Sequence, residues 1–181
     1  LLIEDDAYGF TARGNAAPMT VLLPRQSVYL HSLSKLTCPG LRVAYMLVPS
    51  HCRQLIRRAA RSISMAIPPL SAEIASDLIE SGAAERIMRE KCRMSEERNH
   101  IFRGIFPAHT GNTRSFFQWM PLPVGCGGAN FEAQAQHRGV CVLSSDHFAV
   151  GGEADHSFIR LALCSPPTNE ELVRGLRIVH D

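Results

Sequence analysis

One run of the sequence, residues 43–48, is apolar at every position and reads Val-Ala-Tyr-Met-Leu-Val. A strand with one face in water would alternate apolar and polar residues, so this run predicts a strand buried on both faces, as in α/β proteins. We expect this strand to span residues 41–48 and to share a sheet with two earlier strand-like segments, 1–4 and 27–31.

Helical patterns follow the predicted sheet. Residues 51–64 form a basic amphipathic pattern, and we expect its apolar stripe of Leu55, Ile56 and Ile63 to pack inward. The proline pair at 68–69 would stop this helix.

Two more helices are predicted before residue 105. Ser71 is a suitable N-cap for the first, and Gly82 would end it. Its core side would carry Ile74 and Leu78. The second spans about residues 83–104, and its alternating charges suggest a helix that is exposed on one side and bridges two lobes.

The last part of the chain alternates short apolar segments with helical ones. The order strand, helix, strand, strand, helix fits a small α/β lobe, and Thr168 with Glu171 forms a capping box before the last helix. The expected strands are residues 115–121, 140–143 and 158–163, and the expected helices are 130–138 and 170–180.

Composition limits the possible functions. The chain has 181 residues, of which 45% are hydrophobic and 20% charged, which suits one domain or two small lobes. A net charge of +2 gives no case for a nucleic-acid surface within these residues. The sequence shows no membrane-spanning run and no C-x-x-C pair among its six cysteines. It opens inside an apolar run without a methionine, so we expect a fragment of a longer cytoplasmic protein.

Polar residues follow the first strand, where Asp5 and Asp6 are succeeded by Tyr8. Ligands gather at the carboxyl ends of strands in open α/β sheets. A carboxylate there can keep a ring nitrogen protonated, and a phenol can reach the same ring. Taken alone, these residues fit an ordinary acidic loop equally well.

A lysine follows the strand at 27–31, in the segment Ser32-Leu33-Ser34-Lys35. A lysine amine can form a Schiff base with an aldehyde if its pKa is low enough. The turn at Pro39-Gly40 returns the chain, so we expect Arg42 to lie near Lys35. Hydroxyls and a guanidinium suit a phosphate group. The alternative is a surface lysine beside a turn.

In their order and spacing, these motifs resemble the fold-type-I, class I/II aminotransferase family. The resemblance implies an α/β fold, specifically the C-terminal part of the pyridoxal-phosphate (PLP) dependent transferase fold, with a partial large-domain sheet and a small α/β C-terminal domain. The cofactor it implies is pyridoxal 5'-phosphate. The resemblance to the family covers nearly the whole chain.

The resemblance also implies roles for single residues. Asp5 would pair with the pyridinium nitrogen, and Tyr8 would donate to the 3-oxygen of the ring. Lys35 would form the Schiff base and later move the proton. The residues that would hold or border the phosphate are Ser32, Ser34 and Arg42.

Arg160 is the candidate substrate residue, because an arginine in such a strand of the family's small domain binds the substrate α-carboxylate. It stands between apolar residues in the segment 158–163, where a buried arginine needs a counter-charge. The alternative is an arginine that points to solvent.

Within the family, the chain is most similar to MocR-type regulators, in which a GntR-type winged-helix DNA-binding domain precedes an aminotransferase-like sensor domain. This similarity lies in the segments 32–45 and 116–123 and in Gly139-Val140 followed by Phe148. DNA binding would require that N-terminal domain, and residues before Leu1 would separate a regulator from a genuine aminotransferase.

The resemblance also implies what this chain lacks. The family's N-terminal half supplies a phosphate-binding helix start, a ring-stacking aromatic residue, substrate contacts and much of the dimer surface. We therefore expect these 181 residues to bind PLP weakly, not to transaminate, and to self-associate through exposed core surface.

Three other interpretations compete. Ser32 and Lys35 also satisfy the S-x-x-K pattern of β-lactamases, but the S-D-N and K-T-G motifs are missing and the serine ends a strand. The second is a metal enzyme, but the histidines are scattered and show no spacing typical of metal ligands. The third is a degenerate remnant that keeps the fold without the chemistry. It would differ from a functional domain in that Lys35 would not react with PLP.

Our expected organisation has three parts. Residues 1–70 belong to the PLP-binding large domain, 71–104 are bridging helices, and 105–181 form the small C-terminal domain. The parent would be a cytoplasmic homodimer that recognises an amino acid or amine and has no contact with a membrane.

Overall fold

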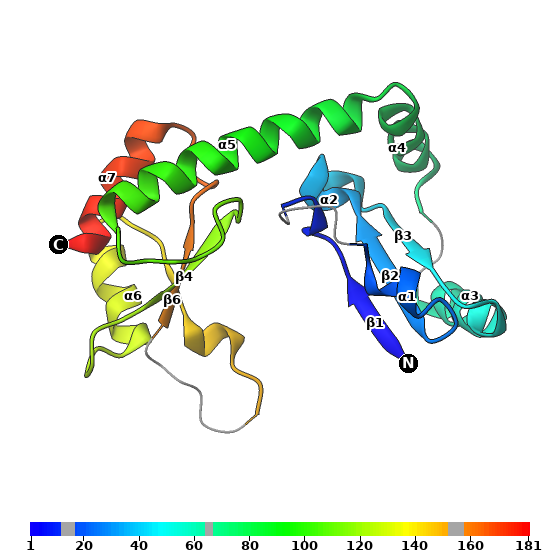
Figure 1. Cartoon of the computed structure of the whole chain (residues 1–181), viewed down its shortest axis with the longest axis horizontal. Coiled ribbons are helices and arrows are strands. Elements are labelled where there is room, and N and C mark those ends of the chain that lie inside the picture. Colours follow the sequence, from blue (N-terminus) through cyan, green and yellow to red (C-terminus); the bar gives the residue numbers. More distant parts are fainter. Residues whose placement is uncertain (12–16, 64–66, 152–157) are drawn as a thin grey trace. The chain divides into compact units, whose positions relative to one another are not determined.

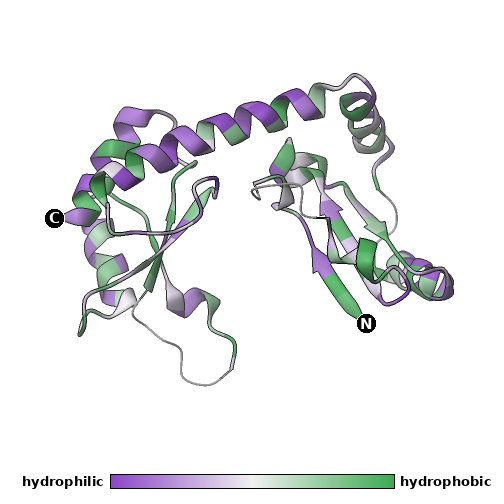
Figure 2. Cartoon of the chain, viewed as in Figure 1, coloured by the Kyte–Doolittle hydropathy of each residue, from purple (hydrophilic) through white to green (hydrophobic). Residues whose placement is uncertain are grey.

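The computed structural model describes residues 1–11, 17–63, 67–151 and 158–181. The chain divides into two compact units, unit 1 (Leu1–Cys92) and unit 2 (Arg93–Asp181). The boundary falls inside helix α5 (Ala83–Ile105). The bounds of this helix are close to the predicted span of 83–104 (Figure 1). Figure 2 shows that α5 is hydrophilic over much of its length, with hydrophobic turns between.

Unit 1 contains a three-stranded sheet in the order β1-β2-β3 (Figure 1). β1 (Leu2–Asp5) pairs in parallel with β2 (Ser27–Ser32), and β2 pairs in antiparallel fashion with β3 (Ala44–Leu47). Because β1 and β2 run in the same direction, their carboxyl ends lie at one edge of the sheet. The other elements are η1 (Gly9–Thr11), α1 (Met19–Leu22), α2 (Leu33–Leu36), η2 (Pro39–Leu41), η3 (Ser50–Cys52), α3 (Arg53–Ile63) and α4 (Pro69–Glu80).

The core of unit 1 packs the short helix α2 against α4 and α5. Leu33 and Leu36, three residues apart on α2, are 2% and 7% exposed. They join one hydrophobic cluster with Ala75 of α4 and Ala84 of α5. Since the leucines occupy the inner side of α2, Lys35 is left on its exposed side.

Strand β3 differs from its prediction in two ways. It begins at Ala44 rather than residue 41, because residues 39–41 form a 3-10 turn and Arg42 adopts a left-handed φ of 55°. All four of its residues are exposed, Leu47 by 63%. The apolar run predicted burial on both faces, but burial depends on segments that lie over the strand, and no described residue of unit 1 covers it.

The apolar stripe predicted for α3 is also wrong. Leu55 and Ile63 are 71% and 87% exposed, and only Ile56 is half-buried. The sequence pattern gave the helix correctly, but no described part of unit 1 packs on its apolar side. The predicted last residue of this helix, Ser64, lies outside the described residues.

The proline pair begins a helix. α4 has Pro68 as its N-cap and Pro69 in its first turn, so Ser71 is not the cap that the sequence predicted. Proline is well tolerated there because its missing N–H would have no partner in the first turn. Ala75, which is fully buried, is the main core residue, and Gly82 follows the end of the helix with φ +70°, as predicted.

Unit 2 is a three-stranded antiparallel sheet with helices, in the predicted order of strands and helices (Figure 1). Its sheet has the strand order β4-β6-β5. The elements are β4 (Phe117–Pro121), α6 (Gly128–His137), β5 (Leu143–Ser144), η4 (Ser145–Phe148), β6 (Phe158–Ala162) and α7 (Asn169–His180). The hydroxyl of Thr168 accepts the backbone N–H of Glu171, so the Thr168 half of the predicted capping box is present.

One face of this sheet is buried in the core of unit 2. Ile159 and Leu161 of β6 are 0% and 4% exposed and pack with Phe102 of α5 and with Leu172 and Leu176 of α7. Alternate residues of the same strands point to the opposite face. The core thus fixes which side chains that opposite face presents.

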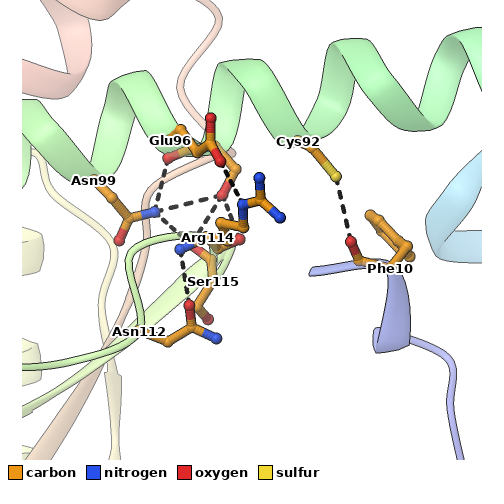
Figure 3. Close-up of polar contacts among 8 residues, drawn as sticks. Phe10, Cys92, Glu96, Asn99, Asn112, Arg114 and Ser115 are labelled. Carbon is orange, nitrogen blue, oxygen red and sulfur yellow. Dashed lines mark hydrogen bonds and ion pairs between the residues drawn. The ribbon is translucent and has the colours of Figure 1, made fainter. Parts of the chain in front are cut away.

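Polar residues of α5 and of the segment before β4 form a hydrogen-bonded network within unit 2 (Figure 3). The side-chain amide of Asn99 donates to the carbonyl oxygens of Ser95, at 2.7 Å, and Ser115, at 2.8 Å. The hydroxyl of Ser95 donates to the carbonyl of Arg114 at 2.6 Å, and Arg114 pairs with Glu96. Ser95 and Asn99 are buried, so these bonds satisfy groups that would otherwise be costly to bury.

Two further findings apply to the described part of the chain. None of its helices is long and apolar enough to cross a membrane. It contains no cluster of three or more histidine, cysteine or carboxylate side chains placed to hold a metal ion.

Candidate functional site

Lys35 lies directly after β2, at the edge of the sheet where β1 also ends. Its side chain is exposed, and its ammonium nitrogen is 5.7 Å from the centre of the Tyr8 ring. Within the described residues no hydrogen bond or ion pair involves the ammonium group of Lys35, so its amine is open to a ligand. The parallel pairing of β1 and β2 therefore brings the Tyr8 and Lys35 segments together, as the sequence predicts.

Asp5 is the last residue of β1 and pairs with Leu30 of β2. Its carboxylate accepts the backbone N–H of Ala7 at 3.1 Å, which holds it at the start of the loop. The exposed carboxylate can therefore meet a positively charged or proton-bearing ring nitrogen.

Ser32 and Ser34 form the start of α2. The hydroxyl oxygen of Ser32 accepts the backbone N–H of Ser34 at 3.2 Å, an N-cap that fixes the turn leading to Lys35. The cap uses one lone pair of the Ser32 oxygen, so its O–H proton remains available as a donor. Both serines can thus take part in binding a phosphate group.

Arg42 lies in the returning chain, as the turn at 39–40 predicts. The backbone N–H of Leu33 donates to the carbonyl of Val43 at 3.2 Å, which closes this return. The Arg42 side chain is exposed, and no described contact joins it to Lys35. The proximity of these two side chains stays a prediction.

Two adjacent residues of α5 contact the segments that carry the site. The ammonium of Lys91 donates to the carbonyl oxygens of Lys35, at 2.9 Å, and Thr37, at 3.0 Å. The thiol of Cys92 donates to the carbonyl of Phe10 at 3.3 Å, in the loop after Tyr8 (Figure 3). Burial lowers the pKa of Lys91, and Cys38 opposes that shift. The sequence did not reveal these contacts, which join residues more than fifty positions apart.

Asp6 has a structural partner that the sequence analysis did not identify. The phenol of Tyr29, on β2, donates to the Asp6 carboxylate. Burial, this hydrogen bond and the negative charges of Asp6 and Glu4 raise the pKa of Tyr29 to about 12. A Cβ atom at Gly9 would overlap the same carboxylate, so a side chain at position 9 would displace it.

Arg160 belongs to β6, in unit 2. Its Cζ atom lies 4.7 Å from the ring centres of both Phe117 and Phe148. Its Nε atom is buried without a hydrogen-bond partner, and no carboxylate among the described residues pairs with it. The counter-charge that the sequence led us to expect is therefore not supplied by this part of the chain, and two aromatic rings contact the cation instead.

The family model for aminotransferase class I and II matches residues 1–176. The uncharacterized HTH-type transcriptional regulator YdeF of Bacillus subtilis is 31% identical over 98% of this chain and 39% of its own length. The 2-aminoadipate transaminase of Thermus thermophilus is 26% identical over 98% of this chain and 47% of its own length. The chain thus spans less than half the length of these relatives.

Solved structures show the same fold. LysN, an α-aminoadipate aminotransferase of Thermus thermophilus, has a TM-score of 0.85 at 23% identity, over 98% of this chain and 48% of that one. An archaeal alanine:glyoxylate aminotransferase has a TM-score of 0.86 at 23% identity, over 99% and 47%. The predicted fold class, part of the PLP-dependent transferase fold, is confirmed. On the family match over nearly its whole length, the chain belongs to the class I and II aminotransferases.

Proposed function

We propose that this chain is the C-terminal part of an aminotransferase-like domain that holds pyridoxal 5'-phosphate on Lys35 and senses an effector in a MocR-type transcriptional regulator. The observation that carries the cofactor role is the position of Lys35. Its exposed amine follows β2 at the edge where β1 delivers Asp5 and Tyr8, 5.7 Å from the Tyr8 ring.

The residues present fit the cofactor. Asp5 offers a carboxylate to a ring nitrogen, and Ser32 and Ser34 offer hydroxyl groups beside the amine of Lys35. When bound, pyridoxal phosphate supplies an electron sink for the carbon next to a substrate amino group. In that setting Lys35 holds the cofactor and can carry a proton, while Arg42 adds positive charge for the phosphate.

The proposed substrate contact is Arg160. Its guanidinium lacks a carboxylate partner among the described residues, so the α-carboxylate of an amino acid would supply the missing charge. We also propose residues 1–70 as the large-domain part, 71–104 as bridging helices and 105–181 as the small domain. The parent protein would be a cytoplasmic homodimer.

Two relatives support different specific functions, a transcriptional regulator and an aminotransferase. The regulator role rests on YdeF, an HTH-type transcriptional regulator. The alternative is a genuine amino-acid aminotransferase that transfers an amino group to a 2-oxo acid, and it rests on the 2-aminoadipate transaminase. Sequencing the gene upstream of Leu1 separates them, because a basic helix-turn-helix domain there would establish a regulator.

The cofactor role is tested by adding excess pyridoxal phosphate, recording the visible spectrum, reducing with borohydride and mapping the added mass. The chain has two lysines, Lys35 and Lys91, so the mapping has to distinguish only these two side chains and the N-terminal amine. We expect a shifted band and added mass on Lys35, both lost in Lys35→Ala. Lys91 is the internal control, because two carbonyl oxygens hold its ammonium.

Labelling of Lys91 to the same extent as Lys35 would contradict a selective site. If the full-length parent protein also gave no shifted band with pyridoxal phosphate, the cofactor role would be wrong and the chain would be a fold without cofactor chemistry. We expect the 181-residue chain itself to bind weakly and not to transaminate, and measurable turnover with an amino donor would contradict that expectation.

A further inference from the structure

The outer face of the unit 2 sheet is aromatic. Arg160 pairs with Trp119 of β4 on one side and Leu143 of β5 on the other, and residues paired directly across strands share a face. Phe117 and Phe158 lie two residues along β4 and β6, so they point to that same face. The opposite face, with Ile159 and Leu161, is buried in the core. We call the residues Phe117, Trp119, Phe148, Phe158 and Arg160 the aromatic face.

The rings of this face contact one another and the single cation. Trp119 stacks on Phe158 with 5.9 Å between ring centres and meets Phe148 edge-on at 5.5 Å. The two rings on Arg160 come from opposite sides of β6, since Phe117 lies on β4 and Phe148 follows β5. A guanidinium packed against rings keeps its in-plane N–H groups for a planar acceptor.

Hydrogen bonds to the Glu132 carboxylate hold the segment that carries Phe148 in position. The carboxylate of Glu132, on α6, accepts the backbone N–H of Ser144 at 2.8 Å and contacts the imidazole of His147 at 3.0 Å. These bonds fix both ends of η4, which carries Phe148. The ring is thus placed before any ligand arrives, which lowers the entropic cost of binding.

We propose that the aromatic face binds ligands that carry one carboxylate beside an aromatic or similarly flat apolar group. The proposal rests on the carboxylate role proposed above for Arg160 and specifies its ligand class. One carboxylate matches Arg160, the one cation among the five residues of the aromatic face. Trp119 and Phe148, 42% and 41% exposed, offer apolar surface next to it. A second carboxylate would lie against rings without a positive partner on this face, which is unfavourable.

The test uses Trp119, the only tryptophan of the chain, as a reporter. The chain is titrated without cofactor with three probes: phenylacetate, its neutral analogue phenylacetamide and the dicarboxylate adipate. We expect a saturable change in tryptophan fluorescence with phenylacetate. Phenylacetamide and adipate should bind about tenfold more weakly or worse, since a charge-assisted hydrogen bond is lost in one and a charge is left unpaired in the other. Equal affinity for either one and phenylacetate would overturn the proposal.

Variants locate the binding. Arg160→Gln should lose phenylacetate binding, and Arg160→Lys should retain only part of it, because lysine lacks the planar fork. Arg177→Gln is the matched control, because Arg177 is an exposed residue of α7 away from the aromatic face, and it should bind like the parent chain. Unchanged binding in Arg160→Gln would refute the site. If that variant fails to fold by circular dichroism, the probe comparison on the unaltered chain still decides.

This experiment and the cofactor test can fail separately. The fluorescence reports on unit 2 in the absence of pyridoxal phosphate, whereas borohydride labelling reports on Lys35 of unit 1. Labelling of Lys35 without selective phenylacetate binding would reject only the ligand class. Selective phenylacetate binding by the chain, together with no labelling of Lys35 in the full-length parent, would reject only the cofactor role.

Discussion

Lys35 and Lys91, the two lysines of the chain, have opposite surroundings. Lys35 is exposed after a strand, while the ammonium of Lys91 is bound to two carbonyl oxygens. The motif around Lys35 could be recognised from sequence because its parts are close together along the chain. Lys91 could not, because its partners are set by how α5 packs on α2, and the sequence around it shows only a charged helix.

Tyr29 gives a pH prediction at the same scale. Its pKa is raised to about 12 in the folded chain, above the ordinary value near 10. Between these values the unfolded chain loses the phenol proton while the folded chain keeps it, so the free energy of unfolding falls as the pH rises. The contribution is fully present below about pH 10 and is lost by about pH 12.

This prediction is checked by denaturant unfolding across that pH range in the parent chain and in Tyr29→Phe. Many other groups titrate there, so only the difference between the two chains is informative. We expect Tyr29→Phe to lose stability less steeply with pH. Parallel curves for the two chains would show that the phenol of Tyr29 is not protected by Asp6.

Helix α5 contributes to the site through its contact with α2. Lys91→Met keeps the apolar stem but removes the ammonium at the end of α2, and we expect a local loss of about 1 kcal/mol. The backbone N–H of Thr37, which donates to Leu33 at 2.8 Å, should then exchange with solvent about fivefold faster. Hydrogen exchange followed by mass spectrometry measures this.

Lys91→Arg is the matched variant, since it keeps the positive charge, and it should restore most of the protection. The rate of borohydride trapping at Lys35 provides a second readout. It should fall in Lys91→Met and recover in Lys91→Arg if Lys91 positions Lys35. Equal trapping rates in all three chains would limit Lys91 to a purely structural role.

The three strands and the helices α3 to α5 of unit 1, and the order of strands and helices in unit 2, could be predicted from sequence because they depend on local patterns. The short helices α1 and α2 were not predicted. Which apolar faces become buried could not be predicted either. The run at 43–48 and the stripe of α3 have the composition of buried surfaces, yet β3, Leu55 and Ile63 are exposed. Burial of a face depends on a covering segment, and a periodicity contains no information about that segment.

At the scale of the whole molecule, this exposed apolar surface predicts self-association. Ile3 on β1 and Leu47 on β3 are 64% and 63% exposed on the two edge strands of one sheet. Unpaired strand edges with apolar side chains favour pairing with another chain. We expect sedimentation velocity to show larger species as the concentration rises, and Leu47→Lys to shift the distribution toward monomer.

Val124→Lys is the control, because Val124 is a fully exposed apolar residue outside any strand, in unit 2. It should leave the distribution unchanged. A clean monomer for the unaltered chain at all concentrations would contradict this prediction.

The close packing of Gly9 against the Asp6 carboxylate has a consequence for how the sequence can change over generations. A side chain at position 9 would displace that carboxylate and remove the acceptor of the Tyr29 phenol. Positions 6, 9 and 29 should therefore vary together among descendants of this gene. A lineage that gains a side chain at position 9 should first have replaced Asp6 with a smaller residue, and should then tolerate phenylalanine at position 29.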